Sequence, residues 1–230
     1  MMRGGLAEPP AWPGPNSSQT GGSASGPGPN SSYGKDPAHP RPSHGLDQFF
    51  GQIKGRAGLT LLDLGRASQA SVTFITSLGH RLCFEDLLRS LDQKGKDASF
   101  LAQQSTPERV ELFMRQSLDF PEQHFDGVLV WDVLEYLPPP LLKPAVDRLF
   151  HIVKPQSLML AFFHAEREAE HLPLHSYRIA DARNICLSPR GKRKPAQVFN
   201  NRGVERLFQR FHSVKFFLAR DHLREVIVKR

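Results

Sequence analysis

Two spacings of hydrophobic residues alternate along the chain, one typical of buried strands and the other of amphipathic helices. Leu59–Leu64 is an apolar run of strand length, as expected for a strand covered on both faces in a parallel sheet. Ser68–Leu78 has apolar residues at helical spacing, and Gly79 ends it. Phe125–Trp131 has the clearest strand pattern of the chain, and Leu141–Val153 then places its apolar residues on one helical stripe.

The same alternation predicts the remaining elements. Further helices are expected at Gly45–Ile53, Leu87–Leu91, Pro107–Met114 and Asn201–Phe211, and further strands at Arg81–Phe84, Gln116–Phe120, Ser157–Phe163, Val214–Leu218 and Glu225–Val228. Alternating strands and helices imply a parallel sheet with helices on both faces, and right-handed crossovers make it doubly wound. The sequence therefore predicts an α/β fold with a doubly wound, mostly parallel seven-stranded sheet and a C-terminal antiparallel hairpin.

Two segments lie outside this regular pattern. Residues 1–44 are rich in Pro, Gly, Ser and Asn, and such a segment cannot bury enough apolar surface to offset its ordering entropy. We therefore predict a disordered tail over 1–44 and a folded domain over 45–230. Within the domain, Arg167 to about Pro195 reads as a long, polar and basic insertion.

Charge and composition narrow the function classes. The net charge is +7, and residues 166–230 alone hold 15 Lys and Arg against 7 Asp and Glu. This bias is compatible with an acidic partner or with a solvated basic face. The basic segment Ser188–Lys194 reads as a surface loop and contains no stacking aromatics, so nucleic-acid binding is not favoured.

Membrane, disulfide and metal chemistry find no support in the sequence. No apolar run approaches the ~20 residues that span a bilayer, and the N-terminus has no secretory pattern. Cys83 and Cys186 form no C-x-x-C motif, which suits a reducing cytoplasm. His164, His171 and His175 do not have a standard metal-binding spacing. No metal site and no particular oligomeric state is predicted.

The candidate ligand site follows the first predicted strands. Ligands of open α/β sheets bind beyond the carboxyl ends of the strands. Asp63, Gly65, Arg66 and Ala67 follow the first strand, in a turn that a nucleotide-type ligand would need to approach closely. Asp63 and the acids after the second strand have an alternative role, because a carboxylate there can cap the next helix.

This turn resembles the first motif of the class I S-adenosylmethionine (SAM) methyltransferases, acid-x-Gly-x-Gly-x-Gly. Asp63 and Gly65 match it, whereas Ala67 and Gln69 stand where the second and third glycines would be. The segment 131–137 (WDVLEYL) resembles the motif after the family's fourth strand. The resemblance covers about Leu59–Arg230, and the order and spacing of the motifs carry it.

The resemblance implies a SAM cofactor and assigns roles along the carboxyl edge. In the family, an acid after the second strand binds the ribose, and here Glu85 or Asp86 holds that place. Ser117 and Leu118 correspond to residues that flank the adenine. The implied cofactor-binding residues are Asp63, Gly65, Arg66, Ala67, Glu85, Asp86, Ser117, Leu118 and Trp131.

The function implied is SAM-dependent methyl transfer to an unidentified acceptor, which the basic bias suggests is acidic. No catalytic residue stands out, and the candidates expected at the same edge are Asp132, Glu135, Tyr136, His164 and Tyr177. One alternative is a methyltransferase-like protein that binds or regulates without catalysis, because the turn has lost two glycines. A nicotinamide-dependent oxidoreductase is less favoured, since the turn lacks the G-x-G-x-x-G spacing.

Overall fold

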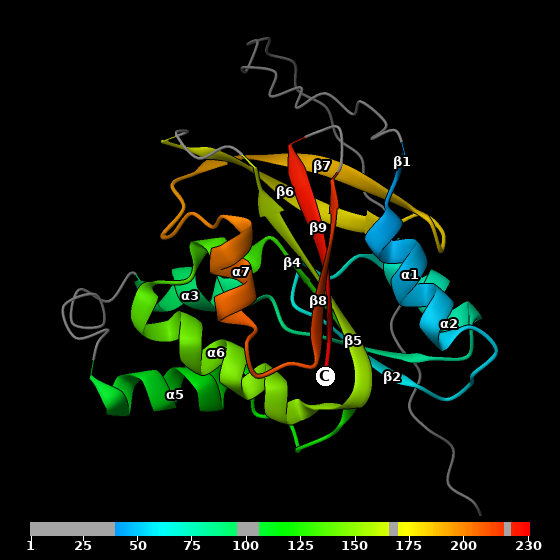
Figure 1. Ribbon diagram of the computed structural model, residues 1–230, viewed down its shortest axis with the longest axis horizontal. Coiled ribbons are helices and arrows are strands. Elements are labelled where there is room, and N and C mark those ends of the chain that lie inside the picture. Colours follow the sequence, from blue (N-terminus) through cyan, green and yellow to red (C-terminus); the bar gives the residue numbers. More distant parts are fainter. Residues whose placement is uncertain (1–39, 96–105, 166–169, 219–221) are drawn as a thin grey trace, which may run out of the picture. The chain divides into compact units, whose positions relative to one another are not determined.

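A mixed six-stranded sheet organises the computed structural model, which describes residues 40–95, 106–165, 170–218 and 222–230 (Figure 1). The strand order is β3 (Arg81–Phe84), β2 (Thr60–Asp63), β4 (Phe125–Trp131), β5 (Val153–His164), β9 (Leu223–Lys229) and β8 (Ser213–Leu218). The first four strands are parallel, and β9 runs antiparallel to both β5 and β8. The predicted α/β class and the closing antiparallel hairpin therefore match the structure.

Helices cover both faces of this sheet, as the buried strands require. Every residue of β4 is buried, so neither face of that strand can meet water. One face packs against α3 (Leu87–Gly95), α5 (Pro107–Ser117), α6 (Pro139–Ile152) and α7 (Asn201–Leu207). The other packs against α1 (His44–Ile53) and α2 (Gln69–Ser77), which lie on the right in Figure 1. No helix among these described residues is long and apolar enough to cross a membrane.

The predicted third strand at Gln116–Phe120 is wrong, and the main sheet has six described strands instead of seven. The helix α5 continues to Ser117 and closes with a hydrogen bond from Leu118 N to Met114 O (2.8 Å). The Arg148 guanidinium of α6 then donates to the carbonyls of Leu118 and Phe120. These carbonyls are thus satisfied by a side chain, where the sequence predicted a neighbouring strand.

The predicted basic insertion forms a second sheet, so the surface loop predicted within it at Ser188–Lys194 is wrong. This sheet has the order β1 (Arg41–Pro42), β7 (Asn184–Arg193) and β6 (Leu172–Ile179), and both pairings are antiparallel. The segment read as a basic surface loop, Ser188–Lys194, lies mostly within β7. In β6, the side chains of Leu172, Tyr177 and Ile179 are buried, and Tyr177 and Ile179 join the same core cluster as α1.

The segment before α1 is part of the fold. Arg41 and Pro42 pair with β7, and Ser43 caps α1 by accepting a hydrogen bond from Leu46 N (3.1 Å). Ser43 Oγ also donates to the buried carboxylate of Glu225 (2.9 Å). The predicted boundary at residue 44 therefore falls inside ordered structure, and the disorder predicted for residues 1–39 lies outside the described residues.

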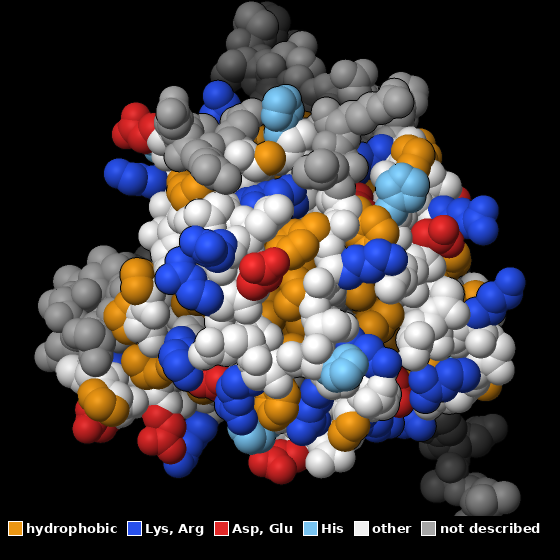
Figure 2. Space-filling model, in the orientation of Figure 1, with side chains coloured by type: hydrophobic (Ala, Val, Ile, Leu, Met, Phe, Trp, Pro, Cys, Tyr) orange, Lys and Arg blue, Asp and Glu red, His pale blue; other side chains and the backbone are white. Residues whose placement is uncertain are grey.

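The sheet ends at β8, whose outer edge has no neighbouring strand among the described residues. Val214, Phe216 and Phe217 of β8 are half-buried. Figure 2 shows hydrophobic side chains in the middle of the view, where β8 and β9 run in Figure 1, with Lys and Arg side chains around them.

Candidate functional site

The candidate site lies at the carboxyl edge of the main sheet, where β2, β4 and β5 end at Asp63, Trp131 and His164. Because β2 pairs with β4 and β4 with β5 in parallel, these three ends fall on the same edge. In this place an open α/β sheet binds its ligand. The structure therefore brings the predicted site residues of the first and fourth strands together.

Asp63, Gly65 and Trp131 form one tight unit there. Asp63 Oδ1 accepts hydrogen bonds from the Gly65 amide (2.8 Å) and from Trp131 Nε1 (2.6 Å). A Cβ placed on Gly65 would lie only 2.7 Å from Trp131 Cδ1, so the glycine is needed for the indole to approach. Trp131 itself has a left-handed backbone (φ 55°), which is uncommon for a bulky residue.

The environment of Asp63 is dry. Burial raises the pKa of this carboxyl from 3.8 to about 7, although the hydrogen bonds from Trp131 and the Gly65 amide oppose the shift. A more distant carboxylate, Asp86, adds to the increase in pKa. Asp63 thus acts as an acceptor that holds the indole, and little solvent reaches it.

The second sheet closes over this unit. The ring of Tyr177 from β6 stacks on the Trp131 indole with a centroid distance of 4.9 Å and an interplanar angle of 1°. Phe162 of β5 contacts both rings edge-on, at 5.4 Å from each. Only 1% of Trp131 and 5% of Tyr177 remain exposed. Figure 1 shows β6 and β7 crossing near the end of β5, above the edge.

The five candidates for catalysis form a buried polar cluster beside this aromatic stack. Glu135, in the short helix η1 (Val133–Tyr136), accepts hydrogen bonds from the His164 backbone amide and from His164 Nδ1 (2.7 Å). Burial raises the pKa of Asp132 to about 7, and the nearby His164 opposes that shift. Burial and the Asp132 carboxyl raise the pKa of both Tyr136 and Tyr177. The structure therefore brings all five predicted residues together.

This cluster has acid–base groups but no open path to them. The side chains of Asp132, Glu135, Tyr136, His164 and Tyr177 are all buried. Arg193 of β7 lies over the Tyr136 ring at 5.7 Å and pairs with Asp92 of α3 (2.9 Å), which ties the second sheet to the other side of the molecule. As folded, the cluster is covered and does not face solvent.

The carboxylates proposed to bind a ribose have other partners. Asp86 accepts a hydrogen bond from the Arg89 amide (3.0 Å) and caps α3, the alternative that the sequence left open. Glu85 accepts one from the Ser90 hydroxyl (2.9 Å) in the same helix. Both remain half-buried. Both carboxylates thus make hydrogen bonds within the start of α3.

The remaining predicted cofactor residues do not share one surface. Arg66 and Ala67 are exposed, whereas Ser117 and Leu118 are buried. Leu118 packs in the core cluster between the sheet and the helices α3, α5 and α6. The Ser117 hydroxyl is buried and has no hydrogen-bond partner in the described part of the chain. Leu118 thus belongs to the hydrophobic core, where the resemblance implied a residue beside an adenine.

The residues at this edge do not fit SAM in the arrangement described. The turn glycine and the motif acid are both committed to Trp131, and the stack of Trp131, Tyr177 and Phe162 occupies the space next to them. Ligand sites of drug-like size are clefts of about 300–1,000 Å³ with a few convergent polar groups. No step of chemistry is therefore derived through SAM here.

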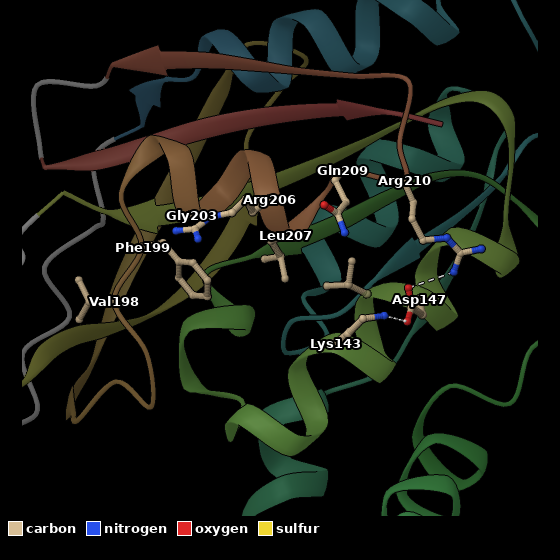
Figure 3. Close-up of a pocket in the computed structure, with 10 residues that line it drawn as sticks. Lys143, Asp147, Val198, Phe199, Gly203, Arg206, Leu207, Gln209 and Arg210 are labelled. Atoms are coloured by element: carbon tan, nitrogen blue, oxygen red, sulfur yellow. Dashed lines mark hydrogen bonds and ion pairs between the residues drawn. The ribbon is translucent and has the colours of Figure 1, made fainter.

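Three cavities of that order lie elsewhere. One of about 450 Å³ lies between α6 and α7 (Figure 3), with Val146, Phe199 and Leu207 as apolar lining. Figure 3 shows Asp147 bonded to both Lys143 (2.7 Å) and Arg210 (3.0 Å) at its rim. A second, of about 610 Å³, lies between α5 and α6. The third, of about 290 Å³, lies beside α1.

Sequence reasoning missed how the second sheet takes part. Tyr177 was expected at the edge, but its stacking on Trp131 was not, and neither was the position of Arg193 over Tyr136. The spacing of apolar residues from Leu172 to Ile179 could have predicted a strand there, but the basic residues around it favoured an interpretation as an insertion. Metal ligands do not gather either: the described ranges contain no group of three or more His, Cys, Asp or Glu placed to hold an ion.

No family model and no curated protein matches the sequence. Among solved structures, the chain is similar to a Burkholderia thailandensis 1,6-didemethyltoxoflavin-N1-methyltransferase bound to its substrate and S-adenosylhomocysteine, with 11% identity and a TM-score of 0.45 over 81% of this chain and 76% of that one. It is also similar to a TehB-like SAM-dependent methyltransferase from Corynebacterium glutamicum, with 10% identity and a TM-score of 0.43 over 81% and 87%.

A third similar structure is the glycopeptide N-methyltransferase MtfA in complex with SAM, with 14% identity and a TM-score of 0.40 over 80% of this chain and 92% of that one. The main sheet itself has six described strands, four of them parallel and followed by an antiparallel pair, the arrangement that the sequence resemblance implied.

Proposed function

We propose that this chain is a non-catalytic binding or regulatory protein built on the class I methyltransferase fold. The observation that carries the proposal is the position of the Trp131 indole, which lies against Gly65 and donates to Asp63. These two residues are the ones that match the family's first motif. Their use as a support for an internal side chain leaves the motif without its ligand-binding surface.

The energy of the aromatic stack supports this interpretation. A ligand that took the place of the indole at Gly65 and at Asp63 Oδ1 would have to displace Trp131. Truncation of a fully buried aromatic side chain costs about 3–5 kcal/mol of stability, so such a ligand would have to offset part of that packing energy.

Calorimetric titration with SAM and with S-adenosylhomocysteine tests the proposal. We expect no binding heat from the wild-type protein up to millimolar ligand. Tyr177→Ala uncovers the indole without removing it, and Trp131→Ala frees the space beside Gly65, so either variant is expected to bind more tightly than the wild type. Wild-type binding with a Kd below about 0.1 mM would contradict the proposal.

The second candidate is a SAM-dependent methyltransferase acting on an unidentified, acidic acceptor. The observation that favours it is the cluster of Asp132, Glu135, Tyr136 and His164 next to the same edge. It requires the second sheet to leave Trp131. Transfer of tritium from methyl-labelled SAM to a panel of acidic peptides and small carboxylates, lost in Glu135→Gln and retained in Asp181→Asn, would support this candidate over the first.

A further inference from the structure

The cavity beside α1 combines an apolar wall with a buried imidazole. Its volume is about 290 Å³, and its lining includes Phe50 and Ile53 of α1, Leu78 at the end of α2, His80 and Ala182. Phe50 and Ile53 are buried at the base of the cavity lining, whereas Leu78 is 41% exposed. The cavity therefore offers apolar surface that the protein itself leaves uncovered.

His80 is the polar group of this wall. Its side chain is only 5% exposed, and its Nδ1 atom is buried without a hydrogen-bond partner among the described residues. Burial lowers the pKa of the imidazole, opposed by Asp126, so the ring is neutral at physiological pH. A buried polar group without a partner costs about 1–3 kcal/mol, and such groups call for an explanation. His80 therefore contributes a neutral, mostly buried ring to the cavity wall.

Positive charge surrounds the mouth of the cavity. Lys54, Arg56 and Arg183 line it, against one lining acid, Asp47. Asp47 pairs with Arg183 (3.1 Å), and Arg56 lies 3.7 Å from Asp126, a buried acid that Lys154 also neutralises (2.9 Å). Lys54 is exposed and has no ion-pair partner in the described structure. The lining thus has an excess of cationic groups.

The end of α1 adds a further negative contribution. The carbonyl end of a helix carries about half a negative charge. One of its last carbonyls, that of Ile53, already accepts a hydrogen bond from the Arg56 amide (3.1 Å). The cations therefore outweigh this partial charge, and an anion is favoured at the mouth.

We propose that this cavity binds a small amphipathic carboxylate, with its apolar body against Phe50, Ile53 and Leu78 and its carboxylate toward Lys54 and Arg56. At about 30 Å³ for each water molecule, the volume is that of roughly ten waters, which is space for a small organic molecule. A phenyl ring with a short carboxylate side chain has this size and this division between apolar and charged ends. The inference does not depend on the proposed function, because it concerns a different part of the molecule.

Titration with trans-cinnamate, followed by amide chemical shifts in two-dimensional NMR of the full-length protein, tests the proposal. We expect saturable shifts at Gly51 and Gly55, with a Kd on the order of 0.1–1 mM for a ligand of about eleven non-hydrogen atoms. The uncharged isostere cinnamamide should bind at least about fivefold more weakly. Equal affinity for cinnamamide, or no cinnamate binding at about 5 mM, would overturn the proposal.

Matched variants locate the site. Leu78→Trp should fill the cavity and weaken cinnamate binding at least about tenfold, whereas Leu112→Trp, at a leucine that is 47% exposed on α5, should leave it unchanged. Lys54→Glu should weaken binding about fivefold, and Lys192→Glu makes the same charge change on β7 without effect. Binding that survives both Leu78→Trp and Lys54→Glu would show that the carboxylate binds elsewhere.

Discussion

The carboxyl edge and the cavity beside α1 differ in how far their side chains are covered. At the edge, the motif acid Asp63 accepts from Trp131 and Gly65, Glu135 accepts from His164, and an aromatic stack covers them. At the cavity, the His80 ring keeps an unpaired Nδ1 and Leu78 stays exposed. The edge that carries the recognisable motif is thus covered by side chains, whereas the region beside α1, which has no motif, contains a cavity. An acid that matches a ligand-binding motif can therefore hold a core side chain instead of a ligand.

The second sheet contributes residues to both the carboxyl edge and the cavity beside α1. Tyr177 of β6 covers the edge, while Ala182 and Arg183, between β6 and β7, line the cavity. The backbone amide of Ser43 bonds to Arg183 O (2.8 Å), which anchors this turn to the start of α1. The β6–β7 pair therefore covers the carboxyl edge and also forms part of the cavity wall.

The largest expected effect is that of Trp131→Ala at the edge. Removing a fully buried indole leaves a cavity and takes away one of the two hydrogen bonds to Asp63, so the free energy of unfolding should fall by about 3–5 kcal/mol. Equilibrium denaturation in urea measures this. Leu112→Ala, at an exposed leucine, is the control and should change stability by less than about 0.5 kcal/mol. A loss below about 1 kcal/mol for Trp131→Ala would mean that the edge is not packed as described.

The next largest effect should be the change in stability with pH that the ionisation of Asp63 causes. Its pKa is near 3.8 when unfolded and about 7 when folded, so the unfolded chain ionises first. Its contribution to stability is present below pH 4 and is lost as the pH rises to about 7, a change on the order of 2–4 kcal/mol. Asp63→Asn keeps an oxygen acceptor for Trp131 but cannot ionise. The variant should therefore gain stability relative to the wild type between pH 4 and pH 7.

Denaturation midpoints of both proteins across that range measure the difference. Asp181→Asn serves as a control at an exposed acid, whose pKa is lowered by hydrogen bonds from the Arg183 amide and from Asn184, so its effect should have the opposite sign. A difference between Asp63→Asn and wild type that does not vary with pH would show that Asp63 is not buried as an acid.

Gly65→Ala should have a smaller effect at the same edge. The new Cβ would lie 2.7 Å from Trp131 Cδ1 and 3.1 Å from Asp63 Oδ1, so the indole must shift. Overpacking of this kind costs about 1–3 kcal/mol. Thermal unfolding, with Gly51→Ala as a control at a glycine whose Cβ would meet nothing within 4 Å, measures it. In a protein that used Gly65 for a ligand instead, the alanine would leave stability nearly unchanged.

The smallest effect is expected from His80→Phe beside α1, and its pH dependence should have the opposite direction to that of Asp63. Burial lowers the pKa of His80, so its contribution to stability is present above about pH 6.5 and is lost as the pH falls. Phenylalanine cannot take up a proton, and the variant should therefore lose less stability than the wild type between pH 6.5 and pH 5. Urea denaturation midpoints at pH 6.5 and at pH 5 measure this difference. A larger loss of stability in the variant than in the wild type would contradict the prediction.

Periodicity predicted most of the main sheet and its helices, because long buried strands and amphipathic helices have strong local patterns. Phe125–Trp131 coincides with β4, and Arg81–Phe84 with β3. The pattern failed at Gln116–Phe120, where Arg148, about thirty residues later, satisfies the backbone that a strand would have paired. It also failed in the basic insertion, because β6 and β7 gain their stability from pairing with each other and from packing on the edge.

The sequence by itself determined the α/β class, most elements of the main sheet and the side chains of the first, fourth and fifth strand ends that meet at the carboxyl edge. These follow from local spacing and from the rule that parallel strands end on the same side of a sheet. Only the tertiary structure decided what those side chains do. Whether Asp63 and Gly65 hold a ligand or an indole depends on the direction of Trp131 and on a ring from residue 177, over a hundred positions from the motif. Contacts over such separations are fixed by packing, which no local pattern records.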